Sequence, residues 1–149
     1  MNKNLRNVCF LVVVCVALIV VAGHFAFKST NEDRKEKLTL AEFLGLKPVP
    51  SLKSVLVGMS AGLVFGFIDN FGLYFGMSAL DPYLPKDKLL AAGLGNTFSD
   101  GVGAFLATFV GVIITNKSGV ENYPILSEAV GIIIGCLIGT YLPGLFLKK

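Results

Sequence analysis

Four long runs of the sequence are almost free of charged residues, and this feature limits what the chain can fold into. The runs cover residues 8–27, 55–77, 89–115 and 125–147, and their only charged side chains are Asp69, Asp100 and Glu128. A helix needs about 20 mainly apolar residues to cross about 30 Å of hydrocarbon. We therefore predict an all-α integral membrane protein with four transmembrane helices, whose first partner is the lipid bilayer.

Composition narrows the function as well. Of the 149 residues, 54% are hydrophobic and 15% are charged, which leaves no room for a soluble catalytic domain. The net charge of +3 comes from scattered Lys and Arg residues; this pattern is typical of membrane anchoring and predicts no nucleic-acid partner. The sequence has no nucleophile with a plausible His partner and no phosphate-binding glycine loop, so we predict neither an enzyme nor a resident cofactor.

The N-terminal segment has the layout of a signal peptide or of a first membrane anchor. Lys3 and Arg6 precede the apolar run, and residues 20–22 resemble a cleavage signal. The run continues to Phe27, which favours an uncleaved anchor over residues 1–28. His24 near its end is expected to lie at the headgroups, with a proton relay as the alternative. Cys9 and Cys15, like Cys136 in the last run, are read as small hydrophobic residues.

A polar segment, residues 29–50, separates this anchor from a predicted core over residues 51–149. Thr39 and Glu42 have the spacing of a capping box, so a short helix is expected from Leu40 to about Gly45, lying on the membrane surface. In the core, short connections predict that the second, third and fourth spans are successive antiparallel neighbours. Pro85 is placed in the first turn of the third span, and Pro143 is expected to end or kink the fourth. The Lys and Arg balance favours neither orientation.

Glycine recurs at every fourth position in the core spans. Positions four apart share one helix face, so each span offers a groove where another backbone can approach closely. The last three helices are therefore predicted to form a glycine-packed bundle, although the same faces could join two chains in a homodimer, and glycine is frequent in membrane helices in any case. The three sets are Gly58, Gly62 and Gly66; Gly103, Ala107 and Gly111; and Gly131, Gly135 and Gly139.

Polar side chains interrupt the second and third spans. Asp69 and Asn70 lie in the second, while Asn96, Ser99 and Asp100 share one face of the third. A charged side chain at membrane depth costs about 2.5 kcal/mol or more, so the aspartates should face the interior, pair, or line a wet cavity. Their oxygen ligands suit Ca²⁺, Mg²⁺ or Na⁺ and do not suit zinc or copper. The alternative is a protonated aspartate that hydrogen-bonds an amide across helices. Glu128, at the start of the fourth span, is expected only to favour that helix terminus.

Three segments of the core carry a family resemblance. They are Gly-Phe-Ile-Asp-Asn at residues 66–70, Leu-Gly-Asn-Thr-Phe-Ser-Asp at residues 94–100, and the glycine-rich stretch at residues 129–139. Over residues 55–147 the chain resembles the transmembrane protein 65 family, in which such segments occur in the same order. The resemblance implies a three-helix membrane core, associated in animals with the mitochondrial inner membrane and with sodium-dependent calcium efflux. The additional N-terminal span, without a transit-like leader, departs from that family and leaves bacterial and viral membranes equally open.

Two functions follow as hypotheses. The first is a membrane protein that binds Ca²⁺ or Na⁺ through Asp69, Asn70, Asn96, Ser99 and Asp100, and transports the ion or regulates its transport. The second is a structural membrane component of an organelle or virion that packs with partner proteins. Because one chain offers few helices for a transport pathway, the first hypothesis extends naturally to a homodimer or to a complex with another membrane protein.

Overall fold

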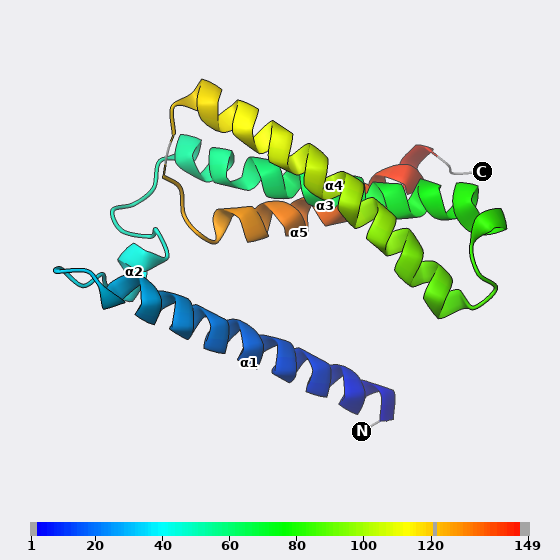
Figure 1. The fold of residues 1–149 in the computed structure, drawn as a ribbon, viewed down its shortest axis with the longest axis horizontal. Coiled ribbons are helices and arrows are strands. Elements are labelled where there is room, and N and C mark those ends of the chain that lie inside the picture. Colours follow the sequence, from blue (N-terminus) through cyan, green and yellow to red (C-terminus); the bar gives the residue numbers. More distant parts are fainter. Residues whose placement is uncertain (1–2, 121, 147–149) are drawn as a thin grey trace. The chain divides into compact units, whose positions relative to one another are not determined.

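The computed structural model describes residues 3–120 and 122–146, and every regular element within them is helical. In chain order these elements are α1 (Lys3–Glu32), α2 (Leu40–Phe43), α3 (Leu52–Leu80), the 3-10 turn η1 (Asp81–Tyr83), α4 (Lys88–Ser118) and α5 (Ser127–Phe146) (Figure 1). The chain divides into two units, residues 1–43 and 44–149. Each unit is described by itself below.

Within the described residues, four helical stretches are long and apolar enough to cross a membrane. They are Arg6–Glu32, Leu52–Tyr74, Lys88–Ser118 and Ser127–Leu145. The prediction of an all-helical chain with four candidate spans is therefore confirmed. The second of these helices, α3, ends at Leu80, directly before Asp81 and Pro82.

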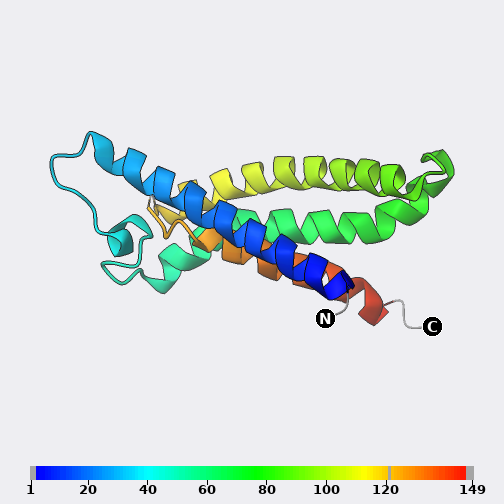
Figure 2. The same cartoon turned by 90° about the horizontal axis from the view of Figure 1, so that it is seen from below.

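The first unit consists of α1 and a folded segment that follows it. α1 is one uninterrupted helix that runs through Glu32 (Figure 2). The Asn31 side chain then accepts a hydrogen bond from the Leu38 amide at 2.7 Å and donates to the Leu38 carbonyl at 3.2 Å. The rings of Phe27 and Phe43 meet edge to face, with centroids 5.4 Å apart. The charged residues between Asn31 and Leu38 thus form a closed loop on the end of α1.

The predicted capping box at α2 is present. The Thr39 amide donates to the Glu42 carboxylate at 2.7 Å, and the Glu42 amide donates to Thr39 Oγ1 at 3.3 Å. These two bonds satisfy backbone groups that a helix start otherwise leaves unpaired. α2 ends at Phe43, slightly earlier than expected, and Gly45 adopts a positive φ of 72°.

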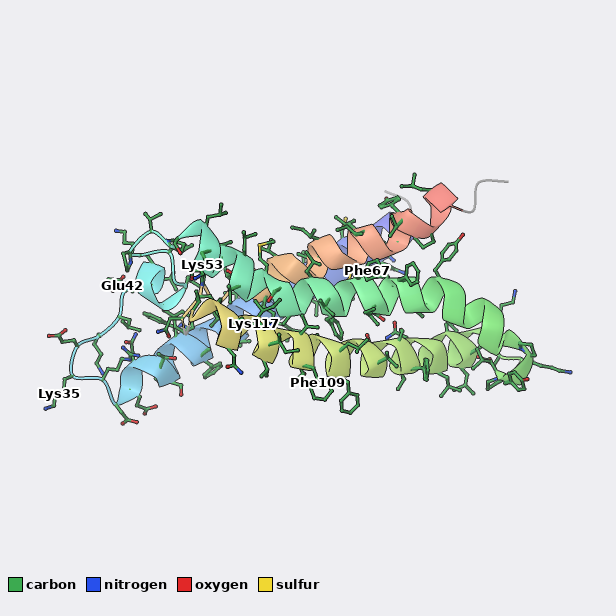
Figure 3. All side chains as sticks on the ribbon, turned by 90° about the horizontal axis from the view of Figure 1, so that it is seen from above. Lys35, Glu42, Lys53, Phe67, Phe109 and Lys117 are labelled. Carbon is green, nitrogen blue, oxygen red and sulfur yellow. The ribbon has the colours of Figure 1, made fainter. Side chains whose placement is uncertain are left out.

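In the second unit α3 is the central helix. α5 packs along one side of α3 and α4 along another, whereas α4 and α5 scarcely touch each other (Figures 1 and 3). The prediction of successive antiparallel neighbours is therefore correct for α3 and α4 but wrong for α4 and α5. The reason is that both outer helices turn their small residues toward α3.

The contact between α3 and α5 is made by backbone against backbone. A Cβ atom on Gly62 or Gly66 of α3 would collide with a carbonyl oxygen of α5, from Glu128 and Ile132 respectively. The relation is reciprocal. A Cβ on Gly131, Gly135 or Gly139 of α5 would collide with the carbonyl oxygen of Met59, Leu63 or Phe67 of α3. The separation of the two helices therefore leaves no room for a side chain at these positions.

The contact between α3 and α4 is less tight. A Cβ on Gly103 would lie 3.2 Å from the Phe65 carbonyl oxygen, and one on Gly111 would lie 3.1 Å from the Ala61 Cβ. Ala107, between these two glycines, is buried. Small side chains fit at this interface, which explains why a serine can occupy the same face one turn before Gly103.

Both ends of α4 are capped, and the helix begins later than the position of Pro85 suggested. Asp87 is the N-cap, and its carboxylate accepts from the Leu90 amide at 2.9 Å. Pro85 thus precedes the helix instead of lying in its first turn, because Asp87 supplies the cap that fixes the start. At the other end Gly119 has a φ of 67° and donates to the Thr115 carbonyl at 3.1 Å. Pro143 does not end α5, which continues to Phe146.

Side chains at the start of α3 tie the connections of the core together. Lys53 Nζ donates to the Ser118 carbonyl at 2.7 Å, at the C-terminus of α4, where a cation is favoured by the helix dipole. Ser54 Oγ donates to the Asn122 carbonyl at 2.9 Å, in the connection to α5. α3 is therefore fixed to both of its neighbours at this end of the unit.

Glycine-to-alanine substitutions test the α3–α5 contact. Gly135→Ala places a methyl group against the Leu63 carbonyl oxygen and should lower the free energy of unfolding by about 1–3 kcal/mol, a typical cost of overpacking. Gly144→Ala is the matched control, because its Cβ meets nothing within 4 Å. It should be neutral or stabilising by up to about 1 kcal/mol, since alanine is the better helix former. Equal unfolding curves for the two variants in detergent would show that the contact does not hold the helices.

Candidate functional site

The five predicted site residues lie well inside the two long core helices. Asp69 and Asn70 belong to α3, and Asn96, Ser99 and Asp100 belong to α4. At a rise of 1.5 Å per residue, Asp69 lies about 26 Å from the start of α3 and Asp100 about 18 Å from the start of α4. Because the helices run antiparallel, both aspartates fall at a similar level of the bundle.

Ser99 joins the two helices. Its hydroxyl donates to Asp69 Oδ1 at 2.7 Å, and the Asn96 carbonyl oxygen lies 3.0 Å from the same Oγ. A carboxylate is the stronger acceptor of the two, so the hydroxyl proton is directed to Asp69 when that group is ionised. Ser99 is only 3% exposed and packs against Gly72 of α3. A larger side chain could not occupy this position without separating α3 from α4.

Asp100 is the second carboxyl group of the site. It accepts a hydrogen bond from Asn96 Nδ2 at 2.6 Å, one helical turn earlier on α4. Its carboxyl group also neighbours that of Asp69, closely enough for the two to interact. The structure therefore brings Asp69, Asn96, Ser99 and Asp100 together at the α3–α4 contact, with one neutral donor for each carboxyl group.

The electrostatics of this pair constrain its chemistry. Two like charges repel strongly where the surroundings are apolar, because the low dielectric constant screens them poorly. The Ser99 and Asn96 donors offset only part of that repulsion, since both are neutral. A proton or a metal cation between the two carboxyl groups would remove this repulsion.

Asn70 lies apart from these four residues. It follows Asp69 directly, so its side chain is turned about 100° around α3 and reaches the contact with α5. A Cβ on Gly139 of α5 would lie 3.2 Å from the Asn70 Cβ, and the Cys136 thiol interacts with the Asn70 side chain. Asn70 thus lies at the α3–α5 contact, next to Asp69 in the chain but outside the α3–α4 contact.

Cys136 is the residue that sequence reasoning missed. It was read as a small hydrophobic residue, and it is a free thiol that lies beside the Asn70 side chain. Its Sγ would be 3.0 Å from a Cβ on Gly66. The sequence signal for this contact was the position of Cys136 directly after Gly135, beside the α5 glycines that contact α3.

The ligands that the site offers are oxygens. Within residues 3–120 and 122–146 no three His, Cys, Asp or Glu side chains gather closely enough to hold a metal ion. A cation here would be held by two carboxylates, the Asn96 amide oxygen and the Ser99 hydroxyl, which are ligands that suit Ca²⁺ and Na⁺. Thr97 is turned away, because its hydroxyl donates to the Gly93 carbonyl at 2.8 Å.

Glu128 takes no part in this arrangement. It lies in the first turn of α5 and is exposed, where a carboxylate interacts favourably with the helix N-terminus. The position matches the expectation from the sequence and makes Glu128 a natural control for the two aspartates.

The chain was compared with known protein families, curated proteins and solved structures. No protein-family model, no curated protein and no solved structure matches the chain. The resemblance to the transmembrane protein 65 family therefore depends on the three sequence segments alone, and the functional conclusion depends on the site.

Proposed function

We propose that this chain is an integral membrane protein that binds a cation between α3 and α4 and transports it or regulates its transport. The observation that carries the proposal is the neighbouring position of the Asp69 and Asp100 carboxyl groups, which come from two different candidate spans. Carboxylates at membrane depth are costly and usually mark ion pathways or binding sites. Ser99 holds the Asp69 carboxyl group toward α4, and Asn96 holds the Asp100 carboxyl group from within α4.

The close α3–α5 contact suits a lipid environment. Lipid tails are as apolar as leucine, so helices in a bilayer associate through close packing and hydrogen bonds between small residues. The reciprocal glycine and carbonyl contacts supply such packing on the α5 side of α3. On the α4 side, the Ser99–Asp69 hydrogen bond supplies a polar link. A glycine-packed membrane bundle would hold the aspartates at a fixed separation.

Ca²⁺ and Na⁺ are the cations that this ligand set favours. Ca²⁺ takes six to eight oxygen ligands, and two bidentate carboxylates with an amide and a hydroxyl oxygen approach that number. Two carboxylates also balance the charge of a divalent ion. The resemblance to the transmembrane protein 65 family points to the same pair of ions. The membrane could be the mitochondrial inner membrane, a bacterial membrane or a viral one.

Cation-dependent thermal stability tests the binding site. Ca²⁺ at 100 times its Kd should stabilise the purified wild type by about 2.7 kcal/mol, because a ligand that binds only the folded state raises its stability. Asp69→Asn and Asp100→Asn should lose this response, since each removes one charged ligand. Glu128→Gln, which changes an exposed carboxylate outside the site, should keep it. An unchanged melting temperature of the wild type in Ca²⁺, Na⁺ and Mg²⁺ would contradict the proposal.

Flux measurements separate transport from regulation. Wild-type protein in liposomes should conduct Ca²⁺ or Na⁺ above the rate of empty liposomes, and both aspartate-to-asparagine variants should fall to that background. Glu128→Gln should retain the wild-type rate. Cation binding by the wild type with a background rate of flux would exclude transport by this chain and leave regulation of a partner transporter.

A structural role is the second candidate, and one observation favours it. The Ser99–Asp69 hydrogen bond links α3 to α4 directly, so the polar residues could serve only to lock the helices of a membrane component that packs with other proteins. Under that hypothesis Ca²⁺ would have no effect on stability. The substitution of Ser99 distinguishes the two roles.

Ser99→Ala removes the donor to Asp69 and leaves a smaller side chain in place. It should lower the free energy of unfolding by about 0.6–1.7 kcal/mol, the range measured for hydrogen bonds between membrane helices. Thr140→Val is the control, because its hydroxyl donates to the Cys136 carbonyl of its own helix. If the site binds a cation, Ser99→Ala should also weaken Ca²⁺ affinity. Lost stability with unchanged Ca²⁺ affinity would show that Ser99 only locks the helices.

A further inference from the structure

One face of α4 has no neighbour among the described residues of its unit. α4 packs only against α3 there. The uncovered face carries small or polar residues, and the rest of the exposed surface of α4 carries bulky apolar ones such as Phe109, which points outward in Figure 3. The uncovered face is formed by Gly93, Asn96, Thr97, Asp100, Gly101, Ala104 and Thr108; we call it the polar face of α4.

The polar face exposes side chains that need hydrogen-bond partners, which lipid tails do not provide. Asn96 is exposed and Asp100 is only half-buried, although both lie in a candidate membrane span. Asn96 gives one amide hydrogen to Asp100, and its other N–H and its Oδ1 make no hydrogen bond with the described residues. Unsatisfied polar groups cost several kcal/mol in hydrocarbon. This face therefore requires a partner with donors and acceptors at the same depth.

Its shape allows a helix to approach closely. A Cβ built on Gly93 or Gly101 would meet nothing within 4 Å, so no contact inside the chain requires glycine at either position. Glycines spaced along a face, with hydroxyl residues between them, are typical of close helix pairs in membranes. Toward the C-terminus of α4 the face continues at Thr108 into a cavity of about 270 Å³ between α3 and α4. The open space at Gly93 and Gly101, together with this cavity, thus leaves room for another helix on the polar face.

We infer that a second copy of this chain covers the polar face, with α4 packed against α4 about a two-fold axis. A two-fold contact presents the same patch twice, so a patch that carries both a donor and an acceptor can pair with itself across the axis. The free N–H of Asn96 then reaches the partner's Asp100, and the reverse. This inference deepens the proposed function, because each cation site gains oxygen ligands from the second copy.

α1 of the same chain is a poorer occupant. Between Val8 and Gly23 its sequence has no amide, hydroxyl or charged side chain, only apolar residues and the thiols of Cys9 and Cys15. A helix of this composition would bury Asn96 and Asp100 without pairing them, which costs more than leaving them half-exposed. Hydrogen-bond complementarity therefore selects the second copy.

Disulfide cross-linking tests the contact in the full-length chain. In a background where Cys9, Cys15 and Cys136 are replaced by alanine, Gly101→Cys should give a covalent dimer under mild oxidation, because the two Cα atoms must lie within about 7 Å of each other. Gly144→Cys, at an open glycine of α5, should not. Cross-linking of Gly144→Cys alone, or of neither variant, would overturn the inference. With native Cys9 and Cys15 restored, a cross-link from Gly101→Cys to α1 within one chain would do the same.

A bulky substitution provides the second test. Gly101→Leu has room to fold within one chain, so its molar mass in detergent should fall two-fold from dimer to monomer, while Gly144→Leu should remain dimeric. A dimeric Gly101→Leu would overturn the inference. Because the molar mass is measured without added cations, this test of the dimer does not depend on the proposed function. If the dimer forms through α4 but Ca²⁺ does not stabilise the wild type, the proposed function fails and the interface stands. If Gly101→Leu is monomeric yet retains full Ca²⁺ affinity, the shared site is excluded.

Discussion

The direct contact between the backbones of α3 and α5 is the constraint on which the rest of the core depends. Where carbonyl oxygens of one helix occupy the space of missing side chains on the other, the two helices can neither slide nor rotate without a collision. This contact fixes the rotation of α3 about its own axis. With one side of α3 assigned to α5, Asp69 is directed toward α4 and its neighbour Asn70 toward α5. The orientation of the site thus depends on the contact that α3 makes with α5 on another of its sides.

The α3–α4 contact is built on a different principle. Here glycines and small side chains of α4 face α3 at a looser separation, and a hydrogen bond from Ser99 to Asp69 contributes a polar link. At the site such an interface is easier to open than a backbone contact, because separating the helices there breaks the Ser99–Asp69 hydrogen bond and meets no interlocked backbone. The carboxyl pair therefore lies at the more adaptable of the two interfaces. A site that must admit and release an ion requires an interface of this kind.

Much of the fold followed from the sequence because its causes are local. Segregated charges predict the spans, and the Thr39–Glu42 spacing predicts the cap of α2. The arrangement of α4 and α5 could not be predicted in this way. Chain order suggested that they are neighbours, but both helices turn their small residues toward α3, on different sides of it. The helix start predicted from Pro85 was wrong because the Asp87 side chain caps α4 and fixes its start.

The site was predictable in part. Helical spacing placed Asn96, Ser99 and Asp100 on one face and turned Asn70 about 100° from Asp69. Which of the two faces α4 depends on the contacts of α3 with α5, which no spacing within α3 reveals. Cys136 was missed for the same reason, because its neighbours lie on another helix.

The degree of burial helps to distinguish a cation site from a structural lock. A lock needs only the buried Ser99 and its acceptor, Asp69, and gains nothing from a second carboxyl group beside the first. Asp100 adds a like charge, and Asn96 holds it in place while remaining exposed. Packing alone gives no reason for this costly second pair. The proposed binding would give one, because a carboxyl pair with one open side is accessible to a cation.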